Sequence, residues 1–196
     1  MKRMHLLTAL ILTAGFAVAS AQTYTADTQS SKLNWTGQKV TGTHTGTVSL
    51  ASGEFTIKDG KVASGTFKIN MNSITSTDLA DNADMAGKLV GHLKSDDFFG
   101  TEAHPTSTFT ITGSTAIAGG NATVTGDLTI KGVTHPVTFK AVLADADGGK
   151  NIYGNIVVDR TLYDVKYGSG KFFEGLADRT IYDEFTIALD VHTKAK

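Results

Sequence analysis

Apolar and polar residues alternate along most of the chain after residue 30. The alternation is clear in SKLNWTG (31–37), GTFKINM (65–71), STFTIT (107–112), HPVTFKAVL (135–143) and EFTIALDV (184–191). A period of two puts every second side chain on the same face of a β-strand. Turn signals such as Asp59-Gly60 and Lys131-Gly132 separate these segments. The pattern predicts about eight or nine strands, each with one apolar face, and therefore an all-β barrel or sandwich.

Residues 78–94 depart from this alternation. Their apolar residues recur every three or four positions, at Leu79, Ala83, Ala86, Leu89, Val90 and Leu93. Acidic residues gather at the start of the segment and lysines near its end, which is the arrangement that a helix dipole favours. The segment is therefore predicted to form one short amphipathic helix from Asp78 to Lys94, packed against the sheet.

The first 21 residues have the pattern of a secretory signal peptide. Lys2 and Arg3 precede a mostly apolar run from Leu6 to Val18, and Ala19-Ser20-Ala21 supplies the small residues that signal peptidase requires. The run is too short for a helix that spans a membrane. We expect cleavage after Ala21 and export to the periplasm or secretion, with residues 22–196 forming a single domain.

The charge and composition of the mature chain exclude several classes of function. Loss of the two basic residues at the N-terminus leaves 16 basic and 19 acidic residues, a net charge of −3. Nucleic-acid binding and stable attachment to anionic membranes both depend on basic surfaces, so neither is expected. The absence of cysteine excludes thiol catalysis and iron–sulfur clusters. The histidines show no metal-ligand spacing, so no metal or other cofactor is expected. The oligomeric state is left open, a homodimer included.

Five motifs occur in a characteristic order. They are GHLKSDDFFG (91–100), HPTSTFTIT (104–112), TGDLTIKGVTHPVTF (125–139), VDRTLYDVKYGSG (158–170) and DRTIYDEFTIALDV (178–191). Together they resemble the YceI-like family of periplasmic, lipocalin-like proteins associated with polyisoprenoid binding, from about Tyr24 to Val191. The segments WTGQKVTGTHTG (35–46) and KYGSGKFFEGLADRTIYDEF (166–185) are similar to the branch common in Bacteroidetes-type bacteria. Where many relatives carry an aromatic-Gly-aliphatic step, this chain has Tyr163-Asp164-Val165.

The resemblance implies a lipocalin-like antiparallel barrel of eight strands with a helix over part of it. It also implies a binding protein that catalyses no reaction and holds the tail of a polyisoprenoid, an isoprenoid quinone or a precursor in an apolar tunnel. Physical chemistry permits this, because an eight-stranded barrel is just wide enough for one slim apolar ligand. Each buried methylene then contributes about 0.8 kcal/mol.

Three other functions stay open. The first is a barrel of the same kind that binds a fatty acid or fatty amide. The second is a stress-related interaction module whose barrel is filled by its own side chains. The third is a hydrolase that uses paired carboxylates among Asp96, Asp97, Asp183 and Glu184.

The candidate ligand contacts fall into three groups. Inward apolar positions of strands and helix are Trp35, Phe55, Phe67, Ile69, Met71, Leu89, Leu93, Phe109, Leu128, Phe139, Ile156, Val158 and Phe185. Two pairs in glycine-bounded loops, Phe98-Phe99 and Phe172-Phe173, either seal one end of the barrel or form the mouth of a ligand site. Arg160, Tyr163 and Tyr167 are candidate contacts for a polar head group. For Arg160 the alternative is an internal salt bridge that fixes the segment from Thr161 to Thr180.

Overall fold

The structure is a computed structural model, and it describes residues 21–196. The predicted signal peptide therefore lies outside the described residues except for Ala21, and both its cleavage and the domain boundary that it sets stay predictions. None of the helices in the described part has the length and apolar character needed to cross a membrane.

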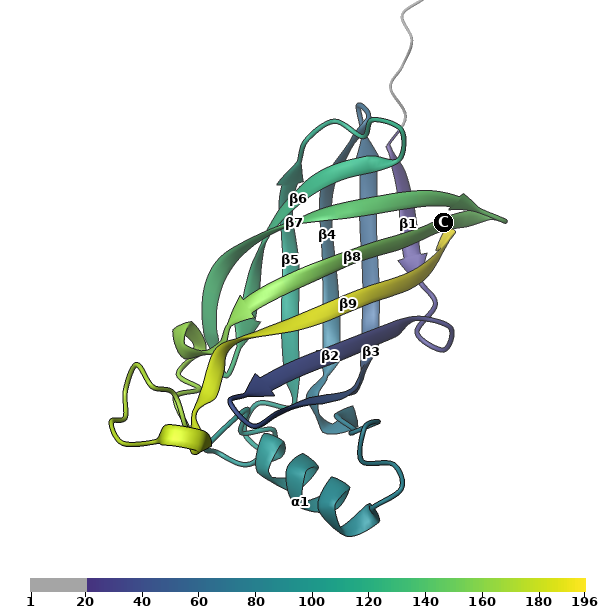
Figure 1. Cartoon of the computed structure of the whole chain (residues 1–196). Coiled ribbons are helices and arrows are strands. Elements are labelled where there is room, and N and C mark those ends of the chain that lie inside the picture. Colours follow the sequence, from purple (N-terminus) through teal and green to yellow (C-terminus); the bar gives the residue numbers. More distant parts are fainter. Residues whose placement is uncertain (1–20) are drawn as a thin grey trace, which may run out of the picture.

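The described residues form the predicted all-β fold, an antiparallel barrel with one α-helix at one end (Figure 1). The strands are β1 (Gln22–Ala26), β2 (Lys32–Lys39), β3 (Gly42–Lys58), β4 (Lys61–Asn70), β5 (Thr106–Ser114), β6 (Asn121–Ile130), β7 (Val133–Ala146), β8 (Gly149–Asp159) and β9 (Ile181–Ala195). The helices are α1 (Ala83–Lys94) and three short 3-10 helices, η1 (Met71–Ser73), η2 (Arg160–Tyr163) and η3 (Ala177–Arg179).

Nine strands occupy eight positions around the barrel. The order runs β3-β2-β9-β8-β7-β6-β5-β4, and pairing of β4 with β3 closes it. β1 and β2 both pair with β3 and β9, with a turn at residues 27–31 between them. The two short strands therefore share one position, and the predicted eight-stranded barrel is confirmed.

The predicted turns close tight hairpins between successive strands. Asp59 and Gly60 connect β3 to β4 with φ values of 53° and 69°, and Lys131 and Gly132 connect β6 to β7 with 50° and 76°. Positive φ at both central residues fits a two-residue hairpin turn, whose twist matches that of the flanking strands. These turns keep neighbouring strands in register, so that the alternating apolar side chains all face the interior.

Helix α1 is shorter than the segment predicted for it. The Asn82 side chain caps it by accepting a hydrogen bond from the Met85 amide, so the helix begins at Ala83 rather than near Asp78. The Asp78 carboxylate instead accepts hydrogen bonds from the Thr45 amide and the Ser76 hydroxyl, and it pairs with His44 at 2.7 Å. These contacts tie the segment before the helix to β3, outside any helical turn.

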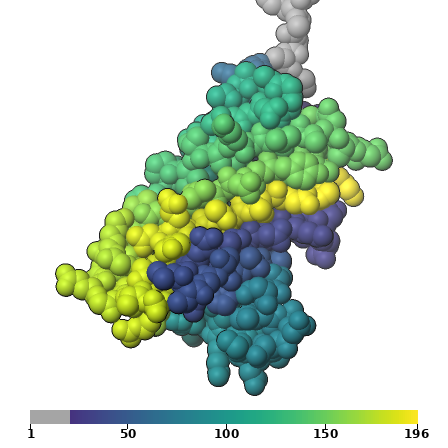
Figure 2. Space-filling view, viewed as in Figure 1, coloured from purple at the N-terminus to yellow at the C-terminus, as the bar shows by residue number. Residues whose placement is uncertain are grey.

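The long segment between β8 and β9, residues 160–180, projects from the same end of the barrel as α1. It starts with η2 and includes η3, and in Figure 2 it protrudes at the lower left beside the start of β9. Its first half is buried, at Arg160, Thr161, Tyr163 and Val165, whereas residues 170–175 are exposed. Helix α1 and this irregular segment thus lie at the same end of the barrel as the candidate site.

Candidate functional site

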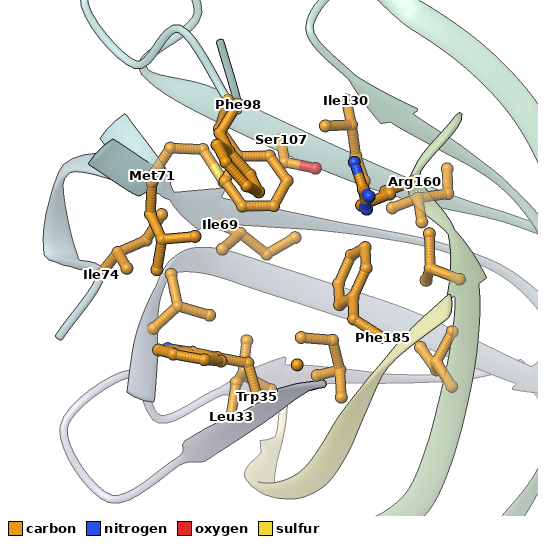
Figure 3. A pocket seen from close by; sticks show the side chains of 18 of the residues that line it. Leu33, Trp35, Ile69, Met71, Ile74, Phe98, Ser107, Ile130, Arg160 and Phe185 are labelled. Atoms are coloured by element: carbon orange, nitrogen blue, oxygen red, sulfur yellow. The ribbon is translucent and has the colours of Figure 1, made fainter. Parts of the chain in front are cut away.

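The barrel encloses an apolar cavity of about 230 Å³ at the end covered by α1. Its wall is formed almost entirely by carbon atoms from all strand positions except β7. Figure 3 shows Trp35 and Leu33 on one side of this space, Phe98 on the opposite side, and Phe185 beside Arg160. Because an engineered apolar cavity of about 150 Å³ already stays dry and accepts benzene, this volume suits an apolar guest better than water.

Trp35 is held in the wall by a polar contact at its edge. Its indole nitrogen donates a hydrogen bond to the Thr75 carbonyl oxygen at 3.0 Å, which leaves the ring face against the cavity. Gly46 lies opposite Trp35 on β3, and a Cβ atom there would lie 2.6 Å from the ring. The absence of a side chain at Gly46 is therefore what makes room for the indole.

The cavity opens where β2 ends and β9 begins. Gln38, Lys39, Tyr182 and Glu184 line it and are also exposed, so they mark its mouth. A register shift between residues 37 and 39 bends β2 at this point. Leu89 and Leu93 of α1 also contribute apolar atoms to the wall, and the helix carries no fully buried residue. The site thus combines a polar mouth with a lightly packed helix in its wall.

Arg160 is a buried cation in the cavity wall, with 3% of its surface exposed. Its guanidinium donates hydrogen bonds to the carbonyl oxygens of Val165 at 2.8 Å, Ile181 at 3.0 Å and Tyr182 at 3.1 Å. The Asp183 carboxylate lies 3.8 Å from the same group. Arg160 therefore fixes both ends of the segment between β8 and β9, mainly through backbone carbonyls.

Burial and hydrogen bonding shift the pKa values around this cation. Burial lowers the pKa of Arg160, and the nearby charges of Asp183 and Asp159 oppose that shift. For Asp159, burial alone would raise the pKa, but hydrogen bonds from the hydroxyl and amide of Thr161 outweigh it and hold the pKa below its usual value. Lys171 adds an ion pair to Asp159 at 3.4 Å. Asp159 therefore acts as an ionised cap of η2.

Asp164 follows η2 at a position with a left-handed backbone conformation. It ends η2 in the left-handed conformation, with a φ of 60°. Glycine adopts that conformation without strain, and aspartate is one of the few other residues that tolerate it. Lys166 pairs with the Asp164 carboxylate at 2.6 Å. Asp164 thus supplies the backbone turn that brings Val165 to Arg160.

The structure brings most of the predicted contacts together around one cavity. Its wall includes Trp35, Phe67, Ile69, Met71, Leu89, Leu93, Phe98, Phe99, Phe109, Leu128, Ile156, Val158, Arg160 and Phe185. Phe55 and Phe139 line a second, smaller cavity of about 50 Å³ farther along the barrel. Whether each of these side chains touches a ligand stays a prediction.

The other four predicted contacts lie outside both cavities. Tyr163 is 1% exposed and packs edge-on against His135, and burial raises the pKa of its hydroxyl. Tyr167 is exposed but contacts the Phe98 ring, with 5.6 Å between ring centroids. Phe172 and Phe173 are 46% and 49% exposed. Lys166 lies over the Phe172 ring, 5.3 Å from its centroid.

Several wall residues were not among the predicted contacts. Seven of them are inward aliphatic residues, namely Leu33, Val48, Leu50, Ile130, Ile187, Leu189 and Val191. Their alternation in the sequence marks them as inward-facing, so the same rule that selected Phe109 would have found them. Ile74 differs, because it follows η1 in a segment without alternation. Only the tertiary fold shows that Ile74 lies against the wall.

The carboxylates considered for hydrolysis do not form one cluster with a shared role. Asp96 and Asp97 are exposed after α1, Asp183 faces Arg160, and Glu184 lies at the mouth. Among residues 21–196 there is no group of three or more His, Cys, Asp or Glu side chains placed to hold a metal ion. No observation favours a hydrolytic site.

Comparison with known proteins agrees with this geometry. The family model described as the YceI-like domain matches residues 24–193. Protein YceI of Escherichia coli is 35% identical over 146 residues, which cover 72% of this chain and 73% of that protein. A UPF0312 protein of Shewanella denitrificans is 37% identical over 89 residues, covering 45% of this chain and only 44% of the relative.

A solved structure shares the fold at low sequence identity. It is a polyisoprenoid binding domain from Saccharophagus degradans implicated in plant cell wall breakdown. It superposes with a TM-score of 0.62 at 16% identity and covers 88% of this chain and 98% of its own. The family match over nearly all described residues, the barrel and its apolar cavity lead to one conclusion: the chain belongs to the YceI-like family.

Proposed function

We propose that this protein binds a lipid, with the apolar tail inside the barrel and the polar head group at the mouth. The single observation that carries the proposal is the carbon-lined cavity of about 230 Å³, which opens beside polar side chains. Folding normally fills a protein interior to the density of an organic crystal, and unfilled space forfeits stabilising contacts. A cavity of this size in the described barrel is therefore best explained by a guest.

The ligand class that we propose is a polyisoprenoid, such as an isoprenoid quinone or its precursor. The Saccharophagus degradans relative is described as a polyisoprenoid binding domain, which supports this class. A fatty acid or fatty amide is the second choice, because the wall offers apolar contact without a group specific for isoprene branches. The hydrocarbon supplies most of the binding free energy in either case, about 0.8 kcal/mol for each enclosed methylene.

The proposed role is sequestration or carriage of the lipid rather than catalysis. The signal-peptide pattern at residues 1–21 supports export to the periplasm or secretion, where a tail of this kind needs shielding from water. Mass spectrometry of the exported protein tests this step, because cleavage after Ala21 predicts a chain that begins at Gln22.

Extraction of the protein purified from its own host is the decisive experiment. Organic solvent is expected to release a prenyl lipid or fatty compound in stoichiometric amount, identified by mass spectrometry. Ile69→Phe adds a ring to the cavity wall and should lower the lipid content, whereas Val157→Phe changes an exposed position on β8 and should leave it unchanged. An empty extract, together with no uptake of added isoprenoid alcohols by the stripped protein, would refute lipid binding.

A further inference from the structure

The barrel interior is divided into two compartments by four side chains. The main cavity of about 230 Å³ and the smaller one of about 50 Å³ share Phe67, Phe109, Leu189 and Val191 in their walls. Phe67 and Phe109 are direct cross-strand neighbours on β4 and β5. Leu189 and Val191 lie on β9, which is three and four positions away around the barrel and so on the facing wall (Figure 1). We call these four residues the partition.

Two glycines hold the aromatic rings of the partition in place. Gly53 lies opposite Phe67 on β3, and a Cβ atom there would lie 2.4 Å from the Phe67 ring. A Cβ atom on Gly126 of β6 would likewise lie 2.5 Å from the Phe109 ring. Each ring therefore covers a glycine backbone directly, a packing that stabilises glycine within a sheet. The rings have no room to move farther towards their own wall.

A second layer of aromatic rings supports the partition from the far compartment. Phe55 stacks against Phe67 with 6.5 Å between centroids, and Phe139 packs against Phe109 at 5.8 Å. Phe55 is 1% exposed, and its neighbours in this compartment include the buried Leu143. The far compartment is thus a packed core with a small residual space, not a continuation of an open tunnel.

The volumes of the two cavities determine how long a hydrocarbon tail the barrel can enclose. A cavity of about 150 Å³ that accepts the six carbons of benzene corresponds to about 25 Å³ per carbon. On that scale the main cavity of about 230 Å³ holds about nine carbons, and both compartments together about eleven. This length corresponds to about two isoprene units of five carbons each.

We propose that the partition limits the enclosed part of a ligand tail to about two isoprene units. A tail of this length places its head group at the mouth, whereas the additional units of a longer tail extend out of the mouth, with the head group beyond them, and add no affinity. The inference rests on the proposed lipid-binding function and adds that affinity depends on the length of the tail only up to this limit. Phe67 and Phe109 would then be the residues that set this limit.

Titration with isoprenoid alcohols of 5, 10, 15 and 20 carbons tests the limit. Trp35 is the sole tryptophan of the chain and lines the main cavity, so its emission reports entry of a tail. Each additional enclosed carbon increases the affinity about fourfold, so the step from 5 to 10 carbons should increase it about 10²- to 10³-fold. The step from 10 to 15 should give less than about tenfold, and the step from 15 to 20 none.

Phe67→Ala tests the residue that sets the limit. Removal of the six ring carbons makes room for about six more ligand carbons, so the 15-carbon alcohol should now bind about 10²-fold more tightly than the 10-carbon alcohol. Phe67→Leu keeps an aliphatic side chain in the core and should produce a smaller shift in the same direction if the alanine variant unfolds. Tyr153→Ala removes an exposed ring on β8 and should behave as the wild type.

The outcomes separate the two proposals. A wild-type affinity that continues to rise steeply from 10 to 20 carbons would overturn the length limit while preserving lipid binding. A folded Phe67 variant with the wild-type length dependence would overturn the assignment of the limit to the partition. Failure of every alcohol to bind, at any length, would instead overturn the proposed function itself.

Discussion

Replacement of Arg160 by leucine tests what holds the segment between β8 and β9 onto the barrel. The guanidinium donates to three backbone carbonyls, those of Val165, Ile181 and Tyr182, at distances of 2.8 to 3.1 Å. Leucine fills part of the space but donates no hydrogen bond. The variant therefore leaves these carbonyls without their donor and Asp183 without its facing cation.

The expected loss of stability follows from two opposing contributions. Hydrogen bonds from a charged donor contribute about 1.5–3 kcal/mol each, and desolvation of a buried cation costs several kcal/mol in the other direction. The net loss should be about 3–5 kcal/mol, as when one member of a buried ion pair is removed. For a chain of this size, each kcal/mol lowers Tm by about 2–4 °C, so a decrease of about 6–20 °C is expected.

Thermal unfolding followed by circular dichroism measures this change. Arg179→Leu provides the matched control, because Arg179 lies in the same segment with an exposed side chain, and surface changes are usually within about 0.5 kcal/mol. Limited trypsin digestion adds a local measurement. Cleavage after Lys166 and Lys171 should accelerate in the Arg160 variant before the barrel itself unfolds.

The same experiment separates the two roles considered for Arg160. If the side chain serves mainly to bind a head group, the lipid-free variant should melt within about 2 °C of the wild type and lose only affinity. That result would refute the structural role derived from its carbonyl contacts.

Two further predictions concern packing and acid stability. Gly46→Ala would place a Cβ atom 1.9 Å from the Thr75 carbonyl oxygen. The free energy of unfolding, measured with urea, should therefore fall by about 1–3 kcal/mol. Gly42→Ala on the same strand is the control, because its Cβ atom meets no atom within 4 Å and should change the free energy of unfolding by less than about 0.5 kcal/mol. The lowered pKa of Asp159 in the folded state stabilises the protein above the unfolded value of 3.8, and this contribution is lost as pH falls through the folded value below it. Asp159→Asn weakens the cap at Thr161 and should therefore cost about 1–3 kcal/mol at pH 7. The difference in stability from the wild type should shrink progressively as the pH falls below 3.8, and a difference that stays constant over that fall would contradict this account.

The alternation of residues was sufficient to predict the strands and the inward position of most of the cavity wall. Phe109 and Leu128, for example, face the interior because their neighbours in sequence are polar and the strand period is two. The turns at Asp59-Gly60 and Lys131-Gly132 were also readable, since glycine adopts positive φ without strain and Asp-Gly is a preferred pair for this hairpin turn. These features are local, and local sequence determines them.

Other features depend on contacts between segments that are distant in the chain. β1 and β2 share one barrel position only because both pair with β3 and β9. Arg160 was a candidate for either a head-group contact or a salt bridge, and its carbonyl partners lie up to 22 residues away. No pattern within one segment could identify them.

The sequence by itself determined which side chains face inward, because strand periodicity is a property of consecutive residues. Only the tertiary structure decided whether those side chains fill the barrel or leave a cavity, because that depends on how far apart facing walls lie. Phe67 and Phe109 illustrate the difference. Their inward position follows from alternation, but their place between two cavities follows from the glycines behind them and from β9 on the facing wall.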